Sequence, residues 1–251
     1  MKKFLLSINI NLGEYDSFLN RIVYNASENI SSYVCVANVH MLVEAYNNQS
    51  FAEIVNNADL ITPDGMPLTW GLKLVHGIRQ ERVAGMDLLP DLLSLASKHK
   101  LPVYFYGGTQ AMLDQTEIYV SENYPDLQLA GMYSPPFRVL TSQEEHQVIN
   151  SINGSGAKIV FVALGCPKQE KWMASMKGYI NATMIGIGGA LPVMIGMQKR
   201  APEWMQRTSL EWLYRLSQEP KRLFKRYAVT NSMYLLLLAK ELFSRKTLKS
   251  I

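Results

Sequence analysis

Short apolar runs recur along the chain with turn-forming residues between them. Seven of these runs are rich in β-branched and aromatic residues and are nearly continuous in apolar character. Strands of this kind are buried on both faces, so they predict a parallel sheet that is covered by helices on each side. The predicted strands are residues 3–10, 33–39, 58–62, 102–108, 127–134, 157–165 and 183–190.

Segments with helical spacing lie between several of the predicted strands. Apolar residues recur every three or four positions in 87–99, 109–122 and 167–177, and Asp, Thr or Pro stands at or near the start of each segment. Strands that alternate with helices indicate an α/β fold. The sequence therefore predicts a Rossmann-like, doubly wound, mostly parallel sheet with a C-terminal helical appendage.

The last fifth of the chain differs from the rest in charge. Residues 1–198 hold 13 basic and 17 acidic side chains, a net charge of −4, whereas residues 199–251 hold 12 basic and 4 acidic side chains, a net charge of +8. A strongly basic segment attracts polyanions, so nucleic acid, anionic lipid and a diphosphate are all candidate partners. We expect a Rossmann-like core over 1–198 and a basic appendage over 199–251.

The basic appendage has the pattern of two amphipathic helices that separate at Pro220. The apolar run from 227 to 239 is too short and too polar to span a bilayer, which requires about 20 residues, but it can lie in a membrane interface. The alternative is packing on the core or on a partner subunit, which would allow a homo-oligomer. The two predicted apolar stripes are Trp204, Thr208, Trp212 and Leu216, and Leu223, Tyr227, Tyr234 and Leu238, and the basic cluster is Lys221, Arg222, Lys225 and Arg226.

Cysteine usage and the N-terminus indicate a cytoplasmic protein. Cys35 and Cys166 are far apart and have no metal-type spacing, so neither a disulfide framework nor a zinc site is predicted. The first apolar run is broken by Ser7, Asn9 and Asn11, and no small-residue cleavage site follows it. That run is more typical of a strand than of a signal peptide.

Glycine-rich loops follow three of the predicted strands, at 106–109, 164–170 and 186–190. In an open parallel sheet, ligands bind beyond the carboxyl ends of the strands, where glycine allows close approach and helix N-termini offer free N–H groups. Any one of these loops alone is better explained by a tight turn, whereas three at one edge favour an anionic, nucleotide ligand. No dinucleotide-binding, P-loop or Asp-x-Asp motif is present, so side-chain cations and backbone N–H groups would have to stabilise a diphosphate.

Asp64 lies in the segment 61–68, ITPDGMPL, directly after a predicted buried strand. Asp and Gly are common turn formers, so Asp64 on its own is explained by a turn. A carboxylate at the carboxyl edge of a parallel sheet is also well placed to act on a ligand. Both interpretations remain open on the residues of this segment alone.

Seven segments, taken together and in order, resemble the WecG/TagA/CpsF family of bacterial glycosyltransferases. The resemblance implies a metal-independent, inverting enzyme without a cofactor, which transfers a sugar from a UDP-sugar to an undecaprenyl-diphosphate-linked saccharide. It also implies work at the inner face of the cell membrane, in teichoic acid, enterobacterial common antigen or exopolysaccharide synthesis. The segments are 36–45, 58–68, 82–88, 104–109, 163–173, 186–191 and 200–227.

The resemblance also implies roles for particular residues. Asp64 falls on the family's general base, and Asn38 falls on a contact to the donor sugar. The segment 167–170 falls on a nucleotide-binding motif near the uridine, and arginines of the appendage fall on positions over the donor diphosphate, which would make the appendage a lid as well as a membrane contact. The predicted substrate-binding residues are Asn38, Thr62, Arg82, Gly107, Gly108, Pro167, Lys168, Gln169, Glu170, Gly188, Arg215, Arg222 and Arg226.

Two departures from the family pattern leave the donor sugar open. Val36 stands where the family commonly has Thr, and Leu191 and Pro192 stand where it commonly has Phe-Asp. An N-acetylmannosaminyl, glucosyl or other hexosyl donor fits the sequence. The alternative function is a non-catalytic, nucleotide-sugar-binding membrane adaptor of the same fold. Nucleic-acid binding is disfavoured because the tail has no base-reading motif and its apolar residues follow a helical stripe.

Overall fold

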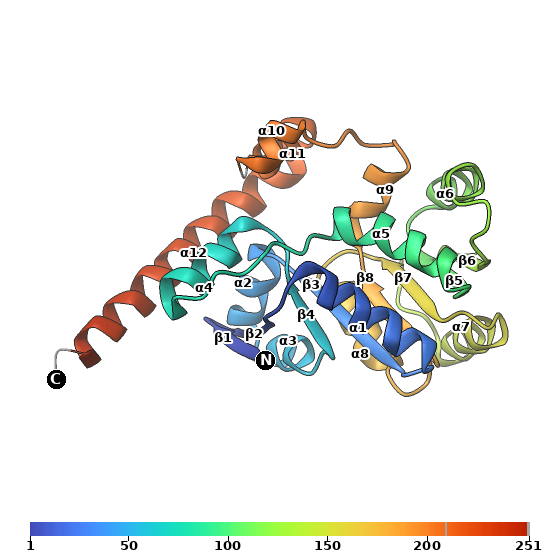
Figure 1. Cartoon of the computed structure of the whole chain (residues 1–251), viewed down its shortest axis with the longest axis horizontal. Coiled ribbons are helices and arrows are strands. Elements are labelled where there is room, and N and C mark those ends of the chain that lie inside the picture. Colours follow the sequence, from blue (N-terminus) through green and yellow to red (C-terminus); the bar gives the residue numbers. More distant parts are fainter. Residues whose placement is uncertain (209, 250–251) are drawn as a thin grey trace.

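The computed structural model describes residues 1–208 and 210–249, which form an α/β fold with a long C-terminal helix (Figure 1). Six parallel strands form one sheet in the order β4-β3-β8-β7-β5-β6. The predicted doubly wound parallel sheet is therefore confirmed, and six of the seven predicted strands belong to it. They are β3 (Ser32–Ala37), β4 (Leu60–Pro63), β5 (Val103–Gly107), β6 (Leu129–Tyr133), β7 (Ile159–Ala163) and β8 (Thr183–Gly186).

Helices cover both faces of this sheet, and each face has its own apolar core. The predicted helices at 87–99, 109–122 and 167–177 are confirmed as α5 (Gly85–Lys98), α6 (Gln110–Asn123) and α8 (Lys168–Met176). On one face α1 (Tyr15–Ser27), α5, α6 and the short α9 (Leu191–Met194) bury their apolar residues. On the other face lie α2 (Val39–Asn47), α3 (Gln49–Asn56), α7 (Ser142–Gly154) and α8, with α4 (Met66–His76) at the flank.

The first predicted strand is wrong in its extent and its place. Residues 3–10 do not form one strand of the main sheet, because the chain reverses at Leu6 and Ser7 to form an antiparallel hairpin. Leu6 adopts a left-handed backbone with a φ of 59°, a conformation that glycine or asparagine usually takes. Burial of Leu5 and Ile8 on the two sides of the turn holds it in place. The hairpin strands are β1 (Lys2–Leu5) and β2 (Ile8–Asn11).

The C-terminal appendage is helical, and Pro220 is the first residue of its long helix, as the sequence predicts. The single helix expected before Pro220 is two short helices, so the predicted stripe that starts at Trp204 and ends at Leu216 is wrong. Trp204 and Trp212 lie on different helices, and both are exposed. The helices are α10 (Glu203–Arg207), α11 (Glu211–Gln218) and α12 (Pro220–Lys249), and residues 209, 250 and 251 of the predicted appendage lie outside the described residues.

One face of α12 packs on the core, against α2 and α4 (Figure 1). Tyr234 and Leu238 are buried in the core there, and the Tyr234 hydroxyl donates to the Pro67 carbonyl oxygen at 2.5 Å. Leu223 is also buried but belongs to neither apolar core. Each such buried side chain contributes about 1.5 to 3 kcal/mol to the free energy of folding. The C-terminal half of the predicted stripe therefore packs on the core, whereas Tyr227 packs edge-on against Trp212 of α11. The membrane contact stays a prediction. In the described part of the chain, no helix combines the length and the apolar content that crossing a bilayer requires.

Candidate active site

A cleft with a volume of about 750 Å³ lies between the carboxyl edge of the sheet and the helices α11 and α12. This volume is typical of pockets that take a small ligand. We call it the Asp64 cleft. Segments that follow β3, β4, β7 and β8 form one wall, and the appendage forms the other. The predicted site residues that line it are Asn38, Asp64, Arg82, Pro167, Lys168, Gln169, Gly188, Arg215, Arg222 and Arg226.

Asp64 stands at the end of β4, where the backbone is held on both sides. Its N–H donates to the carbonyl oxygen of Ala37 on β3 at 2.7 Å, which ties the ends of the two strands together. Gly65 then takes a φ of 100°, a conformation that favours glycine, and α4 begins at the next residue. The turn expected from this segment is therefore present, and it also places the Asp64 side chain in the cleft.

The Asp64 carboxylate is half-buried and electrostatically unusual. Burial raises its pKa to about 7. The positive charge of Arg82 is the next largest influence and lowers the pKa, and the negative charge of Glu211 follows and raises it. Within the described chain the carboxylate accepts no hydrogen bond. A carboxylate with a pKa near 7 and free oxygen atoms is well suited to accept a proton from a ligand at neutral pH.

Arg82 joins the core to the appendage beside Asp64. Its guanidinium donates to Glu211 on α11 at 2.9 Å and to Asp87 on α5 at 2.8 Å, and Arg200 also pairs with Asp87. Arg82 therefore both lines the cleft and pairs with Asp87. Sequence reasoning missed Glu211 as a cleft residue, because no local signal connects two residues 129 positions apart.

The three appendage arginines reach into the cleft from α11 and α12. Arg215 approaches the loop after β8 so closely that a Cβ atom on Gly189 would lie 2.5 Å from its guanidinium. Arg222 is paired with Glu219 on its own helix turn, and the Nε atom of Arg226 is buried without a partner. Among the described lining residues, five are cationic and two are acidic, a net charge of +3. The cleft is therefore suited to a polyanionic group such as a diphosphate.

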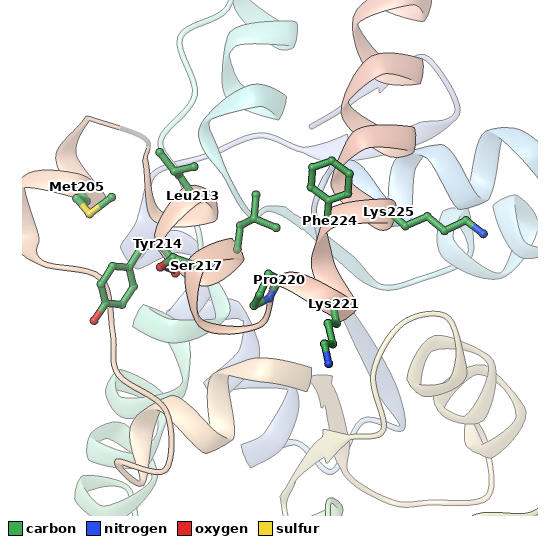
Figure 2. Close-up of a pocket in the computed structure, with 9 residues that line it drawn as sticks. Met205, Leu213, Tyr214, Ser217, Pro220, Lys221, Phe224 and Lys225 are labelled. Atoms are coloured by element: carbon green, nitrogen blue, oxygen red, sulfur yellow. Dashed lines mark hydrogen bonds between the residues drawn. The ribbon is translucent and has the colours of Figure 1, made fainter.

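The predicted basic cluster is divided between two faces of α12. Arg222 and Arg226 line the Asp64 cleft, whereas Lys221 and Lys225 line a separate apolar groove on the outer side of α11 and α12 (Figure 2). This outer groove has a volume of about 810 Å³ and contains none of the predicted site residues. It therefore lies apart from the candidate chemistry. Its lining residues are Met205, Leu213, Tyr214, Leu216, Ser217, Pro220, Lys221, Phe224 and Lys225.

Gln169 holds together the two glycine loops that line the cleft. Its side-chain oxygen accepts a hydrogen bond from the N–H of Gly165 at 3.1 Å, and its amide nitrogen donates to Glu170 at 2.7 Å. A Cβ atom on Gly188 would lie 3.3 Å from the same side-chain oxygen. Glu170 itself is fully buried, burial raises its pKa, and it does not line the cleft. The structure thus places Gln169 at the cleft wall and Glu170 behind it.

Asn38 and His40 lie at the start of α2, where that helix faces α12. The side-chain oxygen of Asn38 caps α2 by accepting from the N–H of Met41 at 3.2 Å, and the residue also lines the cleft. His40 lines the cleft as well, although no pattern in the sequence singled it out. Burial, reinforced by the charge of Arg226, lowers the pKa of His40, which keeps the imidazole neutral at pH 7.

Thr62, Gly107 and Gly108 lie outside the lining of the cleft. Thr62 is fully buried, and its hydroxyl donates to the Val83 carbonyl oxygen at 3.2 Å. Gly107 packs the end of β5 against β7, because a Cβ atom there would lie 2.8 Å from the carbonyl group of Ala163. The ligand contacts expected of these three residues stay predictions. Over the described residues, no three His, Cys, Asp or Glu side chains are grouped to hold a metal ion.

Comparison with known proteins gives matches along nearly the whole chain. The model of the glycosyl transferase WecG/TagA/CpsF family matches residues 4–248. The chain is 30% identical to an N-acetylglucosaminyldiphosphoundecaprenol N-acetyl-beta-D-mannosaminyltransferase of Bacillus subtilis strain 168, over 96% of this chain and 91% of that protein. A protein of the same name from Bacillus spizizenii is 34% identical, over 78% of this chain and 74% of that protein. Another from Staphylococcus aureus strain MW2 is 28% identical, over 83% of this chain and 80% of that protein.

Proposed function

Because the chain belongs to the WecG/TagA/CpsF family of glycosyltransferases, we propose that it transfers N-acetylmannosamine from a UDP-sugar to N-acetylglucosamine on undecaprenyl diphosphate. The names of the relatives support this choice of donor sugar and acceptor, since they are N-acetylglucosaminyldiphosphoundecaprenol N-acetyl-beta-D-mannosaminyltransferases. The proposed product belongs to cell-wall polymer synthesis. The proposed place of action is the inner face of the cell membrane, where such a lipid acceptor resides.

The observation that carries this proposal is the meeting of Asp64 with the appendage arginines in one cleft. In an inverting transfer, the acceptor hydroxyl attacks the anomeric carbon from the side opposite the UDP, and a base removes its proton. Asp64 is the proposed base. Its pKa of about 7 lets it exist as a carboxylate at neutral pH and still bind a proton strongly. A positioned base of this kind contributes about 10² to 10⁴ in rate.

The leaving UDP requires positive charge, and the chain offers it as side chains. Arg215, Arg222 and Arg226 are proposed to neutralise the departing diphosphate, with the N–H groups of the glycine loops beside them. Arg222 is paired with Glu219, so a bound diphosphate would compete for it. Charge supplied in this way makes the proposed transfer independent of a metal ion.

The proposal is tested with purified protein, a panel of UDP-sugars and a short-chain lipid diphosphate that carries N-acetylglucosamine, with and without EDTA. We expect transfer from UDP-N-acetylmannosamine at an unchanged rate in EDTA. Transfer from UDP-glucose instead would correct the donor sugar, and loss of transfer in EDTA would contradict the metal-free mechanism. Binding of a UDP-sugar without transfer from any donor would favour the non-catalytic adaptor.

A further inference from the structure

The Asp64 cleft continues past its polar part into an apolar groove between α4 and α12. On α4, Met66, Pro67, Trp70 and Leu74 follow Asp64 at helical spacing, and Leu235 and Leu238 face them from α12. We call these six residues the α4–α12 groove. Three of them are exposed apolar side chains, with exposed fractions of 50% for Trp70, 57% for Leu74 and 63% for Leu235. Such exposure within a ligand cleft points to a hydrophobic part of a ligand.

The two helices of the groove run side by side in the same direction (Figure 1). Tyr234 of α12 bonds to Pro67 at the start of α4, and Arg245 of α12 bonds to the carbonyl oxygen of Val75 near the end of α4. Gly71 permits this close approach, because a Cβ atom on it would clash with the Tyr234 hydroxyl. The groove is therefore a built feature of the fold, and its walls are fixed by hydrogen bonds.

Polarity changes along the face of α12 that lines the cleft. Arg222 and Arg226 come first, Thr230 and Asn231 follow, and Leu235 and Leu238 come last. At a rise of 1.5 Å per residue, the step from Arg226 to Leu238 covers about 18 Å. Asp64 lies two residues before the start of α4, and α4 meets α12 at Tyr234, which lies between Arg226 and Leu238 in the sequence. The cleft thus offers a cationic side and an apolar side to the two substrates that meet at Asp64.

We propose that the α4–α12 groove binds the isoprenoid chain of the acceptor, which enters the cleft from the side opposite the UDP-sugar. This assignment rests on the proposed function, since only a lipid-linked acceptor carries such a chain. The arrangement matches the order of groups along the reaction partners. The UDP lies among the arginines, the reacting sugars meet at Asp64, and the isoprenoid chain extends along α4 and α12. The outer groove beside Lys221 and Lys225 then takes no part in acceptor binding.

The proposal is tested first by photo-cross-linking of the whole protein, which does not require catalysis. The probe is a fifteen-carbon isoprenoid diphosphate with a benzophenone group at the end of its chain. We expect cross-links in residues 66–76 and 231–242, which are suppressed by unlabelled farnesyl diphosphate but not by dihexanoyl phosphatidylglycerol. Cross-links confined to 205–225, or spread over the surface, would overturn the assignment. Equal suppression by the phospholipid would assign the groove to bulk membrane lipid instead.

Kinetics with matched acceptors provide the second test. Because Leu74 and Leu235 are exposed, the double variant Leu74→Gln, Leu235→Gln should fold. Leu236→Gln is the control, because Leu236 is at least as exposed but lies outside the groove. For an acceptor with a fifteen-carbon isoprenoid, we expect the double variant to raise KM about tenfold. For the same sugar diphosphate on a propyl chain, KM should not change. An equal rise of KM for both acceptors, or an equal rise caused by Leu236→Gln, would contradict binding of the isoprenoid in the groove.

Absence of transfer from every UDP-sugar would refute the proposed function. The cross-linking result would then decide by itself whether the groove binds an isoprenoid.

Discussion

Replacing Asp64 by Asn should remove activity and, at alkaline pH, make the protein more stable. The reason is that burial raises the pKa of Asp64 from 3.8 to about 7 in the folded protein, whereas the unfolded chain keeps the ordinary value. Between these two pH values the folded state holds a proton that the unfolded state has lost. The free energy of unfolding therefore falls as pH rises through this window, and stability from this group is fully present only below pH 4.

The size of the effect follows from the shift. A change of about 3 pKa units corresponds to about 4 kcal/mol, at 1.36 kcal/mol per unit. Only the part of the window above pH 5, about 2 pKa units, is crossed between pH 5 and pH 8. Ionisation of Asp64 over that range therefore destabilises the wild-type protein by about 2 to 3 kcal/mol. The neutral amide of Asn removes that charge at nearly the same volume.

Urea unfolding of wild type and Asp64→Asn at pH 5 and pH 8 measures the effect. The informative quantity is the change, between pH 5 and pH 8, in the stability difference between variant and wild type. Any cost of burying the Asn amide is the same at both pH values and cancels. We expect the variant to gain about 2 to 3 kcal/mol relative to wild type on going from pH 5 to pH 8, with unchanged m-values. A stability difference that does not depend on pH would refute the raised pKa.

Glu211→Gln tests the physical cause of that raised pKa. The negative charge of Glu211 raises the pKa of Asp64, so its removal should lower the pKa and shrink the pH-dependent gain of Asp64→Asn. It also releases Arg82 from an ion pair of 2.9 Å, which strengthens the attraction of Arg82 for the Asp64 carboxylate. An unchanged pH dependence in the Glu211→Gln background would show that the appendage does not influence the base.

Two further variants separate the arginine contacts from general effects of the appendage. Gly189→Ala should displace Arg215 and lower kcat about tenfold with little loss of stability, because the added Cβ atom meets only the end of a flexible side chain. The control Gly154→Ala meets open space and should change neither kcat nor stability. Equal kcat values for Gly189→Ala and wild type in a transfer assay would contradict the role of Arg215. Arg222→Ala should lower kcat/KM for the UDP-sugar by about 10- to 100-fold, and Lys221→Ala, on the outer face, should have little effect; similar losses from both would indicate unspecific electrostatics.

The sheet could be predicted from the sequence because its strands are buried on both faces. Near-continuous apolar runs leave few alternatives, and six of them became strands of the sheet. The N-terminal hairpin could not be predicted in the same way. Its turn at Leu6 and Ser7 carries no glycine or asparagine, so the run resembles one strand, and only burial of residues on both sides of the turn decides the reversal.

The site was predictable where its residues follow strand ends, and unpredictable where distant segments meet. Asp64 and Gln169 follow buried strands, so a parallel sheet had to bring them to one edge. The spacing of the tail shows that Arg222 and Arg226 share one face, but not whether that face or the lysine face meets the core. The pairing of Arg82 with Glu211 depends on how the appendage folds back, which no local pattern encodes.

The pH dependence of a single transfer step tests the role of Asp64 most directly. The rate of one turnover, with both substrates bound before mixing, is measured from pH 5 to pH 9 for wild type and for Asp64→Asn. If Asp64 is the base, the wild-type rate rises with pH to a plateau with its midpoint near pH 7, where the carboxyl group loses its proton. The variant should be about 10² to 10⁴ slower and independent of pH over this range. A variant that keeps the same midpoint, or a rate close to that of wild type, would contradict the assignment of Asp64 as the base.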